Sequence, residues 1–513
     1  MNFETAHTLF KRYGAELVIF AVTAALFGFC ALGDFEPHYD GEMLKPAADV
    51  AAGKILFRDT FSRHGFLTVF FQAFAIKLGG ATLWTVRVSA VCFYALSAVL
   101  LYQIWARALR QYRWAVIALF WLLPAFHMPQ WTFLVWSPVY ALFFLLLSIA
   151  WMQKSLDFER KIDYYLIGAS SICAFWCRPS FGSVFAAAAL FALALHWRDG
   201  ESWRATGRRL LRLGIGAAAF SALIAGYLVF ADAWRDWVTQ AILFEFRSGG
   251  EDVTGVAAGG LWPAGILSGL FPGGTFYLLF PLFTLGFALR GGWRVYRGKA
   301  RPADWVLLAV ALPALASWHQ YYPAGSPRHW FWAAIPMFGF AVLGVRELPR
   351  PVWRWGAAAV LLLLLLPELT PRMKGFCDSV AGFDSRREVA NIPVLRHLRL
   401  SGGQYQYWNN IRKAFDAVPD EFRGRPYVNL TDAGLYCFFF PGDWSFHPMY
   451  MNWQRRVYND YPDRLREFVA RENPVLVYLS DRDPDPGRRF ARVSGASTDL
   501  SLYILLPRPK EKP

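Results

Sequence analysis

The chain has 513 residues, of which 55% are hydrophobic and only 18% are charged, with a formal net charge of +15. A soluble protein of this length carries roughly 25% charged residues, so the composition excludes an ordinary soluble protein. The basic residues stand in clusters between long apolar runs, which is the pattern of positive cytoplasmic loops in a membrane protein and argues against nucleic-acid binding.

The apolar runs predict a mainly α-helical, polytopic membrane bundle of about eleven transmembrane helices, since a helix crosses a bilayer with about 20 residues. The first run, 16–32, is long and lacks a clear small-residue cleavage site, which favours a retained helix over a cleaved signal peptide. The later spans are expected at 83–106, 115–128, 137–152, 164–177, 180–197, 213–231, 270–289, 305–318, 330–345 and 356–369.

Short basic loops follow every second span, beginning with the second. Placing these loops in the cytoplasm puts the N-terminus inside and the C-terminal third outside. The loops 33–82, 232–269 and 319–329 then all fall on the outer face. We therefore expect a multi-pass protein of a bacterial inner (plasma) membrane with this orientation.

The chain is expected to divide into a transmembrane domain, 1–370, and a small extracytoplasmic α/β domain, 371–513, where the sequence becomes polar and broken by turns. In the second part DRLREFVAREN predicts a helix, and RPYVNLT, PVLVYLS and LSLYILL predict strands. Cys377 and Cys437 fall in this part and could form a disulfide if it is extracytoplasmic. The other four cysteines lie in apolar runs and are expected to be core residues.

The first outer loop, 33–82, holds a dense group of acids directly after the first span. The group consists of Asp34, Glu36, Asp40 and Glu42, and Asp59 follows between Arg58 and the pair Arg63-His64. Residues 42–52 are expected to form a helix that Gly53 stops, and 66–78 a second one, both lying in the interface plane. Acids this close to hydrocarbon are costly unless they are solvated, paired or used. The alternative is that the acids have no catalytic function and only keep the loop solvated.

A carboxylate at membrane level can act as a general base toward an acceptor hydroxyl while a lipid phosphate leaves. Such a phosphate needs cationic partners, and arginine is preferred for bidentate contact. Arg178 lies between two apolar runs, where a guanidinium is costly unless a phosphate or an acid faces it or it reaches the interface. The candidate substrate-binding residues are Arg58, Arg63, His64, Arg178, Arg328 and His329, with Tyr321 and Tyr322 as aromatic side chains for stacking on a sugar.

These residues resemble the C-type (GT-C) glycosyltransferase superfamily, most closely the branch of protein O-mannosyltransferases and lipid A aminoarabinose transferases. The resemblance rests on the D-x-E-x-x-x-D series at 34–40, the helix ending AADVAAGK, the LFRDTFSRHG group and the run closing FAIKLGG. Arg87, FWCRPSFG and YYPAGSPRHWFWAAIP fit later positions of the pattern, so the resemblance covers about residues 15–350.

The resemblance implies a GT-C bundle that transfers a hexose or pentose, with inversion, from a polyprenyl-phosphate carrier to a glycan, lipid or protein on the outer face. It implies Glu36 or Asp40 as the base and Asp59 as the second loop acid, and Asp34 is a further candidate acid. Two departures stand out. Spaced acids replace the family's adjacent Asp-Glu pair, and Arg63-His64-Gly65 stands in place of its Lys-Pro-Pro.

We expect no nucleotide, because no glycine-rich phosphate loop is present, and no obligatory metal, although clustered carboxylates can hold a divalent cation. One alternative is a flippase for polyprenyl-linked glycans, which predicts charges near mid-bilayer and internal repeats. The other is a membrane scaffold for cell-envelope glycan assembly. Substitution of the loop acids separates these functions, because an enzyme would lose turnover and a scaffold would not.

Overall fold

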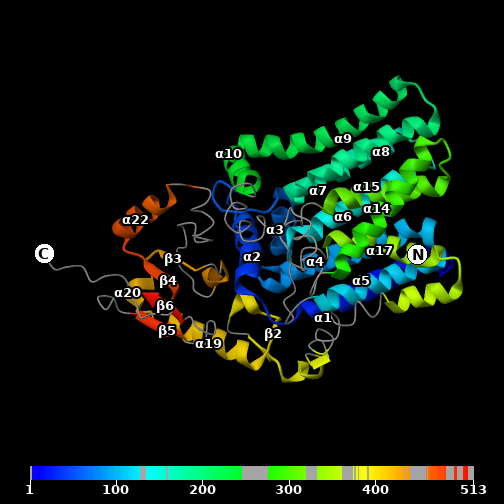
Figure 1. Cartoon of the computed structure of the whole chain (residues 1–513). Coiled ribbons are helices and arrows are strands. Elements are labelled where there is room, and N and C mark those ends of the chain that lie inside the picture. The colour runs from blue at the N-terminus through cyan, green and yellow to red at the C-terminus, as the bar shows by residue number, and fades with distance from the viewer. Residues whose placement is uncertain are drawn as a thin grey trace.

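The computed structural model shows a bundle of long helices with a smaller mixed α/β part at one end (Figure 1). It describes residues 3–127, 135–157, 160–244, 275–318 and 332–360, followed by 374, 377–378, 380–389, 392–416, 418–423, 425–431, 434–438, 458, 460–480, 490–493 and 501–505.

The bundle is built from apolar helices. They are α1 (Phe3–Ala31), α4 (Leu83–Leu109), α5 (Arg113–His127), α6 (Ser137–Ser155), α7 (Lys161–Cys177), α8 (Gly182–Asp199), α9 (Trp203–Phe230), α14 (Thr275–Tyr296), α15 (Pro302–Trp318), α17 (Phe338–Glu347) and a helix at 351–360. Single turns of 3-10 helix lie between several of them: η1 (Arg110–Tyr112), η3 (Pro179–Phe181) and η6 (Ile335–Met337).

Five segments of the described chain are long and apolar enough to cross a membrane: Tyr13–Ala31, Leu83–Leu122, Ser137–Ser155, Pro179–Asp199 and Trp203–Phe230. The predicted polytopic helical membrane protein is therefore confirmed, whereas the number of spans stays a prediction. The core lies between α1, α4, α6 and α17, where Trp105 is fully buried and packs on Gly339 so closely that a Cβ there would lie 2.1 Å from the indole.

Two shorter helices follow α1 in the first loop, as the sequence predicts, but the first begins at Pro37 and not at Glu42, so it includes Asp40 and is capped by Glu36. α2 (Pro37–Ala51) ends before Gly53, whose φ of 97° is a left-handed value that glycine adopts without strain. α3 (Phe66–Gly79) is the second. Figure 1 shows α2 running across the end of the bundle, between the bundle and the C-terminal part.

The C-terminal part contains a four-stranded sheet in the order β3-β4-β6-β5, with β3 and β4 parallel and the other pairs antiparallel. The register pairs Val428 with Leu476 and Val477 with Ile504. The strands are β3 (Tyr427–Asn429), β4 (Val475–Ser480), β5 (Phe490–Val493) and β6 (Ser501–Leu505), beside a two-stranded pair, β1 (Arg387–Glu388) and β2 (Arg399–Leu400). The helices are α19 (Gly402–Asp416), α20 (Asp420–Arg423), α22 (Tyr461–Glu472) and the 3-10 turns η7 (Phe383–Ser385), η8 (Pro393–Leu395) and η9 (Gly434–Phe438).

The helix and the strands expected in this part are present, whereas the expected disulfide is not. Cys377 and Cys437 are both free thiols. Cys437 is buried in η9 against α2, while Cys377 is exposed. The prediction of a bond between them was wrong because the fold buries one partner and leaves the other at the surface.

The C-terminal part contacts α2 directly. α2 packs on η9, and a Cβ at Gly41 would lie 2.3 Å from the backbone nitrogen of Leu435. The backbone N–H of Ser401 donates to Asp34 Oδ1 at 2.8 Å, which adds a contact at the end of α1. The first loop is thus held between two parts that are distant in sequence.

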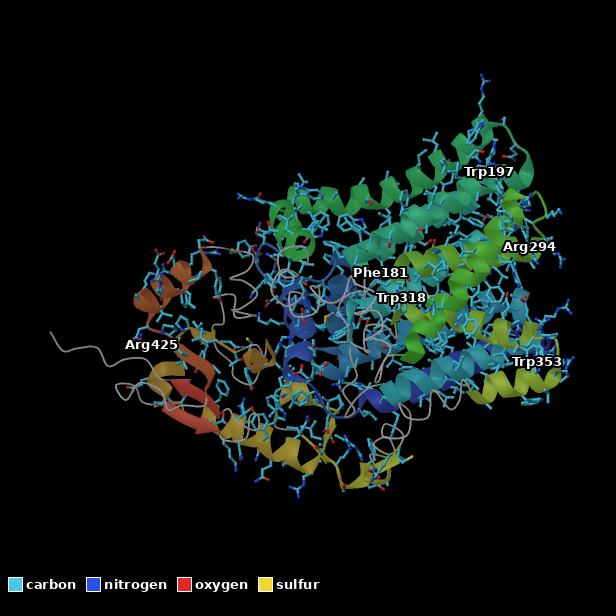
Figure 2. All side chains as sticks on the ribbon, viewed as in Figure 1. Phe181, Trp197, Arg294, Trp318, Trp353 and Arg425 are labelled. Carbon is cyan, nitrogen blue, oxygen red and sulfur yellow. The ribbon has the colours of Figure 1, made fainter. Side chains whose placement is uncertain are left out.

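The basic loops lie together at the other end of the bundle. Arg107 pairs with Asp157, Arg198 donates to the Leu156 carbonyl, and Arg346 donates to the Ala108 carbonyl, so these contacts join separate loops. Figure 2 shows Trp197, Arg294 and Trp353 at this end and Arg425 at the opposite one. The structure therefore separates the basic loops from the first loop, as the charge pattern predicts, and the side that faces the cytoplasm stays a prediction.

Candidate active site

Two acids fix the start of α2. Glu36 is the N-cap, and its Oε2 accepts a hydrogen bond from the Tyr39 N–H at 2.5 Å. Asp40 Oδ2 accepts from the Glu36 N–H at 3.0 Å, so the two side chains satisfy N–H groups that the first helical turn leaves unpaired. Burial raises the pKa of Glu36.

Asp40 is paired with a buried arginine. Arg87, near the start of α4, is fully buried and donates to Asp40 Oδ2 at 2.9 Å. It also donates to the carbonyls of Ala31 at 2.8 Å and Gly33 at 3.1 Å, so it joins the end of α1 to α2 and α4. The other carboxylate oxygen, Asp40 Oδ1, is buried without a hydrogen-bond partner among the described residues. Burial raises the pKa of Asp40, although the Arg87 charge opposes this.

Glu42 contacts two side chains of the loop that follows α2, the guanidinium of Arg63 and the imidazole of His64. Arg63 binds both of its carboxylate oxygens, with Nη2 at 2.9 Å from Oε2, and His64 Nε2 lies 3.0 Å from Oε1. The Glu42 side chain is 3% exposed and that of Arg63 is 22% exposed. Burial alone would raise the pKa of Glu42, but the Arg63 charge and the hydrogen bonds outweigh it and hold this pKa well below its usual range.

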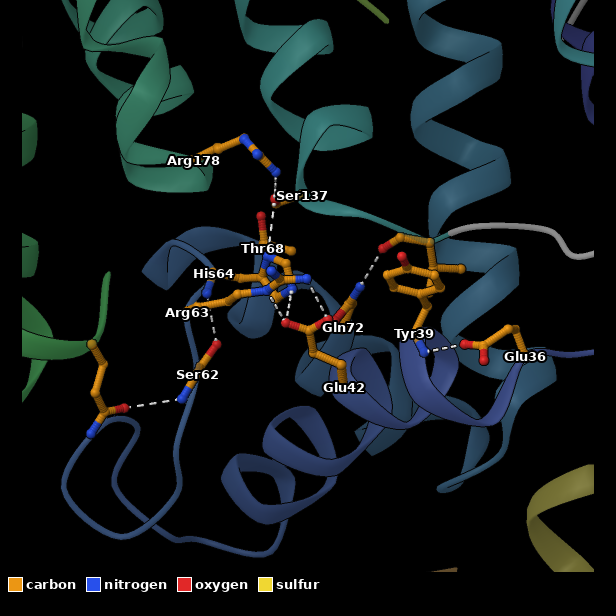
Figure 3. A network of polar contacts seen from close by, with 12 residues as sticks. Glu36, Tyr39, Glu42, Ser62, Arg63, His64, Thr68, Gln72, Ser137 and Arg178 are labelled. Carbon is orange, nitrogen blue, oxygen red and sulfur yellow. Dashed lines mark hydrogen bonds and ion pairs between the residues drawn. The ribbon is translucent and has the colours of Figure 1, made fainter. Parts of the chain in front are cut away.

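A chain of hydrogen bonds runs from His64 to Arg178 (Figure 3). His64 Nδ1 lies 3.1 Å from Ser137 Oγ, and Arg178 Nη1 donates to the same hydroxyl at 3.3 Å. Burial lowers the pKa of His64, which favours the neutral imidazole. The direction of the His64–Ser137 hydrogen bond depends on the imidazole tautomer, because a hydroxyl that accepts from Arg178 can either donate to Nδ1 or accept a second bond from it.

Arg178 lies where α7 ends and η3 begins, half-buried between two apolar helices. Its Nε donates to Ser180 Oγ at 3.1 Å, so both of its side-chain partners are neutral hydroxyls. Within the described part of the chain, Arg178 makes no ion pair with a carboxylate. The sequence allows three explanations for an arginine at this position: an acid partner, a phosphate or a place at the membrane interface. No described carboxylate is its partner, so a phosphate and an interfacial position are the explanations that stay.

Gly65 brings the Arg63-His64 segment against the end of α7. Its N–H donates to the Cys177 carbonyl at 3.1 Å, and Thr68 Oγ1 donates to the same carbonyl at 2.9 Å. A Cβ at Gly65 would lie 2.3 Å from the Trp176 carbonyl oxygen. The site geometry thus depends on a glycine, because any side chain would push the loop away from α7.

The other side of this loop is held by Gln240, in a short π-helix, η4 (Val238–Leu243), that follows α10 (Trp234–Trp237). Its amide accepts from the Ser62 N–H at 3.0 Å and donates to the Phe57 carbonyl at 2.7 Å. It also donates to the Tyr458 hydroxyl at 2.9 Å, which connects the loop to the C-terminal part. π-helical turns of this kind are frequent at functional sites.

The network unites Arg63, His64 and Arg178 of the predicted residues, but it leaves others elsewhere. Asp59 pairs with Arg58 and caps its own turn, with Oδ2 accepting from the Ile55 N–H at 2.8 Å. Arg58 also donates to the Ala231 carbonyl, and Asp34 binds the C-terminal part. The predicted sugar-binding loop, with Tyr321, Tyr322, Arg328 and His329, lies outside the described residues.

Two residues of the network were not selected from the sequence. Glu42 is one of the loop acids. It stands three residues after Tyr39, and on a helix this spacing puts both side chains on the same face, which was a usable signal that Glu42 faces inward. Ser137 gives no signal, because a serine at the start of an apolar helix is ordinary. No three His, Cys, Asp or Glu side chains of the described segments gather as a metal site requires.

The chain resembles two solved structures over most of its length, while no family model and no curated protein matches it. One is ArnT from Cupriavidus metallidurans bound to undecaprenyl phosphate, with 14% identity, a TM-score of 0.49, and coverage of 96% of this chain and 98% of that one. The other is the Archaeoglobus fulgidus oligosaccharyltransferase tethered with an acceptor peptide, with 11% identity, a TM-score of 0.45, and coverage of 92% and 70%.

Proposed function

We propose that this protein is an inverting glycosyltransferase that moves a sugar from a polyprenyl-phosphate carrier to an acceptor on the outer face of the membrane. The observation that supports this best is Arg178, a guanidinium between two apolar helices whose side-chain partners are hydroxyls. A lipid-linked phosphate would supply, at membrane level, the negative charge that no described residue gives Arg178.

The phosphate would bind between Arg178 and Arg63. Arg63 is fixed by Glu42, and Arg178 is joined to the same carboxylate through Ser137 and His64. A cation held in place before the reaction stabilises the charge that develops on the leaving phosphate without reorganising during the reaction. Glu42 is then a positioning residue, because its low pKa makes it a poor base.

Asp40 is the proposed general base, with Glu36 as the second choice. One Asp40 oxygen is held by Arg87 and the other has no partner in the described part of the chain, and its raised pKa moves it toward the working pH. The acceptor O–H gives its proton to this carboxylate while the oxygen attacks the anomeric carbon. The bond from that carbon to the phosphate oxygen breaks, and its electron pair leaves with the phosphate. A single displacement of this kind inverts the anomeric centre.

The test measures transfer and donor binding separately, in membranes supplied with undecaprenyl phosphate carrying a labelled hexose or pentose. Asp40→Asn should reduce transfer by about 100-fold or more while donor binding stays, because the base is lost. Asp40 also pairs with buried Arg87, so the two proteins are compared at equal amounts of folded protein. Arg178→Gln should weaken donor binding by about tenfold or more, because a charge-assisted hydrogen bond to phosphate is lost. Glu36→Gln and Asp59→Asn test the other predicted acids.

Matched controls are Arg235→Gln and Asp232→Asn, exposed positions beside α10 at the same end of the molecule. Normal transfer in all acid variants would contradict the proposal and favour a scaffold. Movement of the labelled lipid across the membrane without transfer to any acceptor would favour a flippase.

A further inference from the structure

A second feature lies at the end of the bundle that carries the basic loops, away from α2. Helices α5, α14, α17 and 351–360 enclose a hollow of about 510 Å³. Its walls are mostly apolar, with Leu119, Leu122, Phe280 and Val342 among the lining residues. Two arginines, Arg346 and Arg354, also line it.

Neither of these arginines is neutralised within the described residues. Arg346 Nη1 donates to the Ala108 carbonyl at 2.8 Å, and Arg354 Nε donates to the Leu348 carbonyl at 2.8 Å. The hydrogen-bond partners are thus backbone carbonyls, and Arg346 also lies 5.6 Å from the centre of the Tyr112 ring. No carboxylate of the described residues compensates the charge of either guanidinium.

A neighbouring hollow shows the contrast. It has a volume of about 430 Å³, shares Leu279 with the first, and is lined by Arg290. Arg290 is bound by both carboxylate oxygens of Glu347, at 2.5 and 3.1 Å. Of these two hollows, only the larger combines apolar walls with positive charge that no described carboxylate compensates.

We infer that the larger hollow binds one anionic phospholipid of the leaflet at the basic end, with its phosphate on Arg346 and Arg354 and an acyl chain against α5 and α14. The walls match acyl chains, and basic pockets between transmembrane helices bind anionic headgroups. Trp355 and Tyr112, both partly exposed at the same hollow, are side chains that favour the headgroup level. The inference does not depend on the proposed function, because the hollow and the candidate active site lie at opposite ends.

The experiment is native mass spectrometry of the delipidated full-length protein, titrated with phosphatidylglycerol or with phosphatidylcholine. The wild type should bind one phosphatidylglycerol more tightly than phosphatidylcholine. The double variant Arg346→Gln/Arg354→Gln should lose about 25-fold in phosphatidylglycerol affinity, because each arginine near an anionic headgroup contributes about fivefold. Arg354→Gln alone should lose about fivefold in phosphatidylglycerol affinity. Because this position is exposed, the single variant should fold normally and keeps the test valid if the double variant misfolds.

Two further variants separate the site from general effects. Arg297→Gln/Arg350→Gln removes the same charge from the same end at positions that do not line the hollow, and should bind like the wild type. Ala118→Trp fills the hollow without changing charge and should lower the occupancy of both lipids. Equal affinity of the wild type for the two lipids, equal losses in both double variants, or unchanged occupancy in Ala118→Trp would each overturn the inference. The last outcome would mean that another part of the chain fills the hollow.

Discussion

Two arginines of the candidate active site differ in what faces them. Arg63 is bound to the buried carboxylate of Glu42, whereas Arg178 is bound to the hydroxyls of Ser137 and Ser180. The Arg63–Glu42 pair holds the loop in place, whereas Arg178 keeps a positive charge that a ligand at the membrane can bind. This division assigns stability to Glu42 and ligand binding to Arg178, and the two can be measured separately.

Glu42→Gln should lower the free energy of unfolding by about 3 kcal/mol at pH 7, because it leaves Arg63 without its buried partner. The pKa of Glu42 in the folded protein lies below its ordinary value of 4.5. Its contribution is therefore fully present above pH 4.5 and declines as the pH falls toward the folded value. Unfolding curves of both proteins in detergent should lie far apart at pH 7 and converge in acid.

Asp157→Asn is the matched control, because the Arg107–Asp157 pair is exposed, at 35% and 42%. An exposed pair contributes at most about 1 kcal/mol, so this variant should unfold close to the wild type. A Glu42→Gln protein as stable as the control at pH 7 would contradict the structural role given to Glu42.

The residue types of the site were predictable from the sequence, but their pairing was not. Three acids of the first loop (Asp34, Glu36 and Asp40), the basic group at Arg63-His64 and Arg178 were predicted as functional, whereas Glu42 was not singled out. Sequence spacing gives no information on which acid faces which cation, since Arg87 reaches Asp40 over 47 positions and Arg63 reaches Glu42 over 21. The roles of Glu36, Asp40 and Asp59 in catalysis stay predictions.

At the scale of elements, the loop between α2 and α3 is held on two sides. Gly65 contacts the end of α7, and Gln240 of the π-helix binds the backbone at Phe57 and Ser62. The segment that carries Arg63 and His64 is therefore fixed before any ligand arrives, which is the preorganisation that a charged site needs.

Gly65→Ala should disrupt this element, because its Cβ would overlap the Trp176 carbonyl and Cys177. We expect a loss of about 2 kcal/mol in stability, as for overpacking in a core, together with loss of donor binding. Gly286→Ala is the control: a Cβ there meets nothing within 4 Å, and alanine is the better helix former. Thermal unfolding and binding of labelled undecaprenyl phosphate would check both variants, and a Gly65→Ala protein that binds donor normally would remove the glycine from the site.

The elements themselves followed closely from sequence periodicity and breakers. α2 ends before Gly53, α3 covers the amphipathic run, and the C-terminal strands fall where branched and aromatic residues cluster. The disulfide failed because two cysteines in one polar region say nothing about which of them the fold buries. α9 begins at Trp203, earlier than expected, because its basic first turns are helical although they are too polar to count as part of a span.

At the scale of the whole molecule, one end of the bundle carries the basic loops and the other carries α2 and the C-terminal part (Figure 1). Contacts such as Arg107–Asp157 join the basic loops to one another. The positive-inside rule predicts that this end faces the cytoplasm. The same orientation would place the candidate active site and the C-terminal part outside.

A membrane-impermeant maleimide tests this orientation. Cys377 is exposed and belongs to the C-terminal part of the chain. Lys299 is exposed in a basic loop. In a background that retains only the tested thiol, Cys377 should react in intact spheroplasts, whereas the thiol of Lys299→Cys should react only after permeabilisation. The reverse pattern would invert the topology and move the proposed reaction to the cytoplasmic face.

The close contact between Gly41 of α2 and Leu435 of η9 has a consequence for how this protein can change over evolutionary time. The backbone of α2, which carries the acids, packs directly on the backbone of η9 in the C-terminal part. A larger residue at this contact would therefore require the other backbone to move away. Recombination that exchanged only the C-terminal part would break this match and shift the acids with it. An exchange of the C-terminal part alone would therefore need compensating changes in α2, although almost 400 positions of sequence separate the two contacting residues.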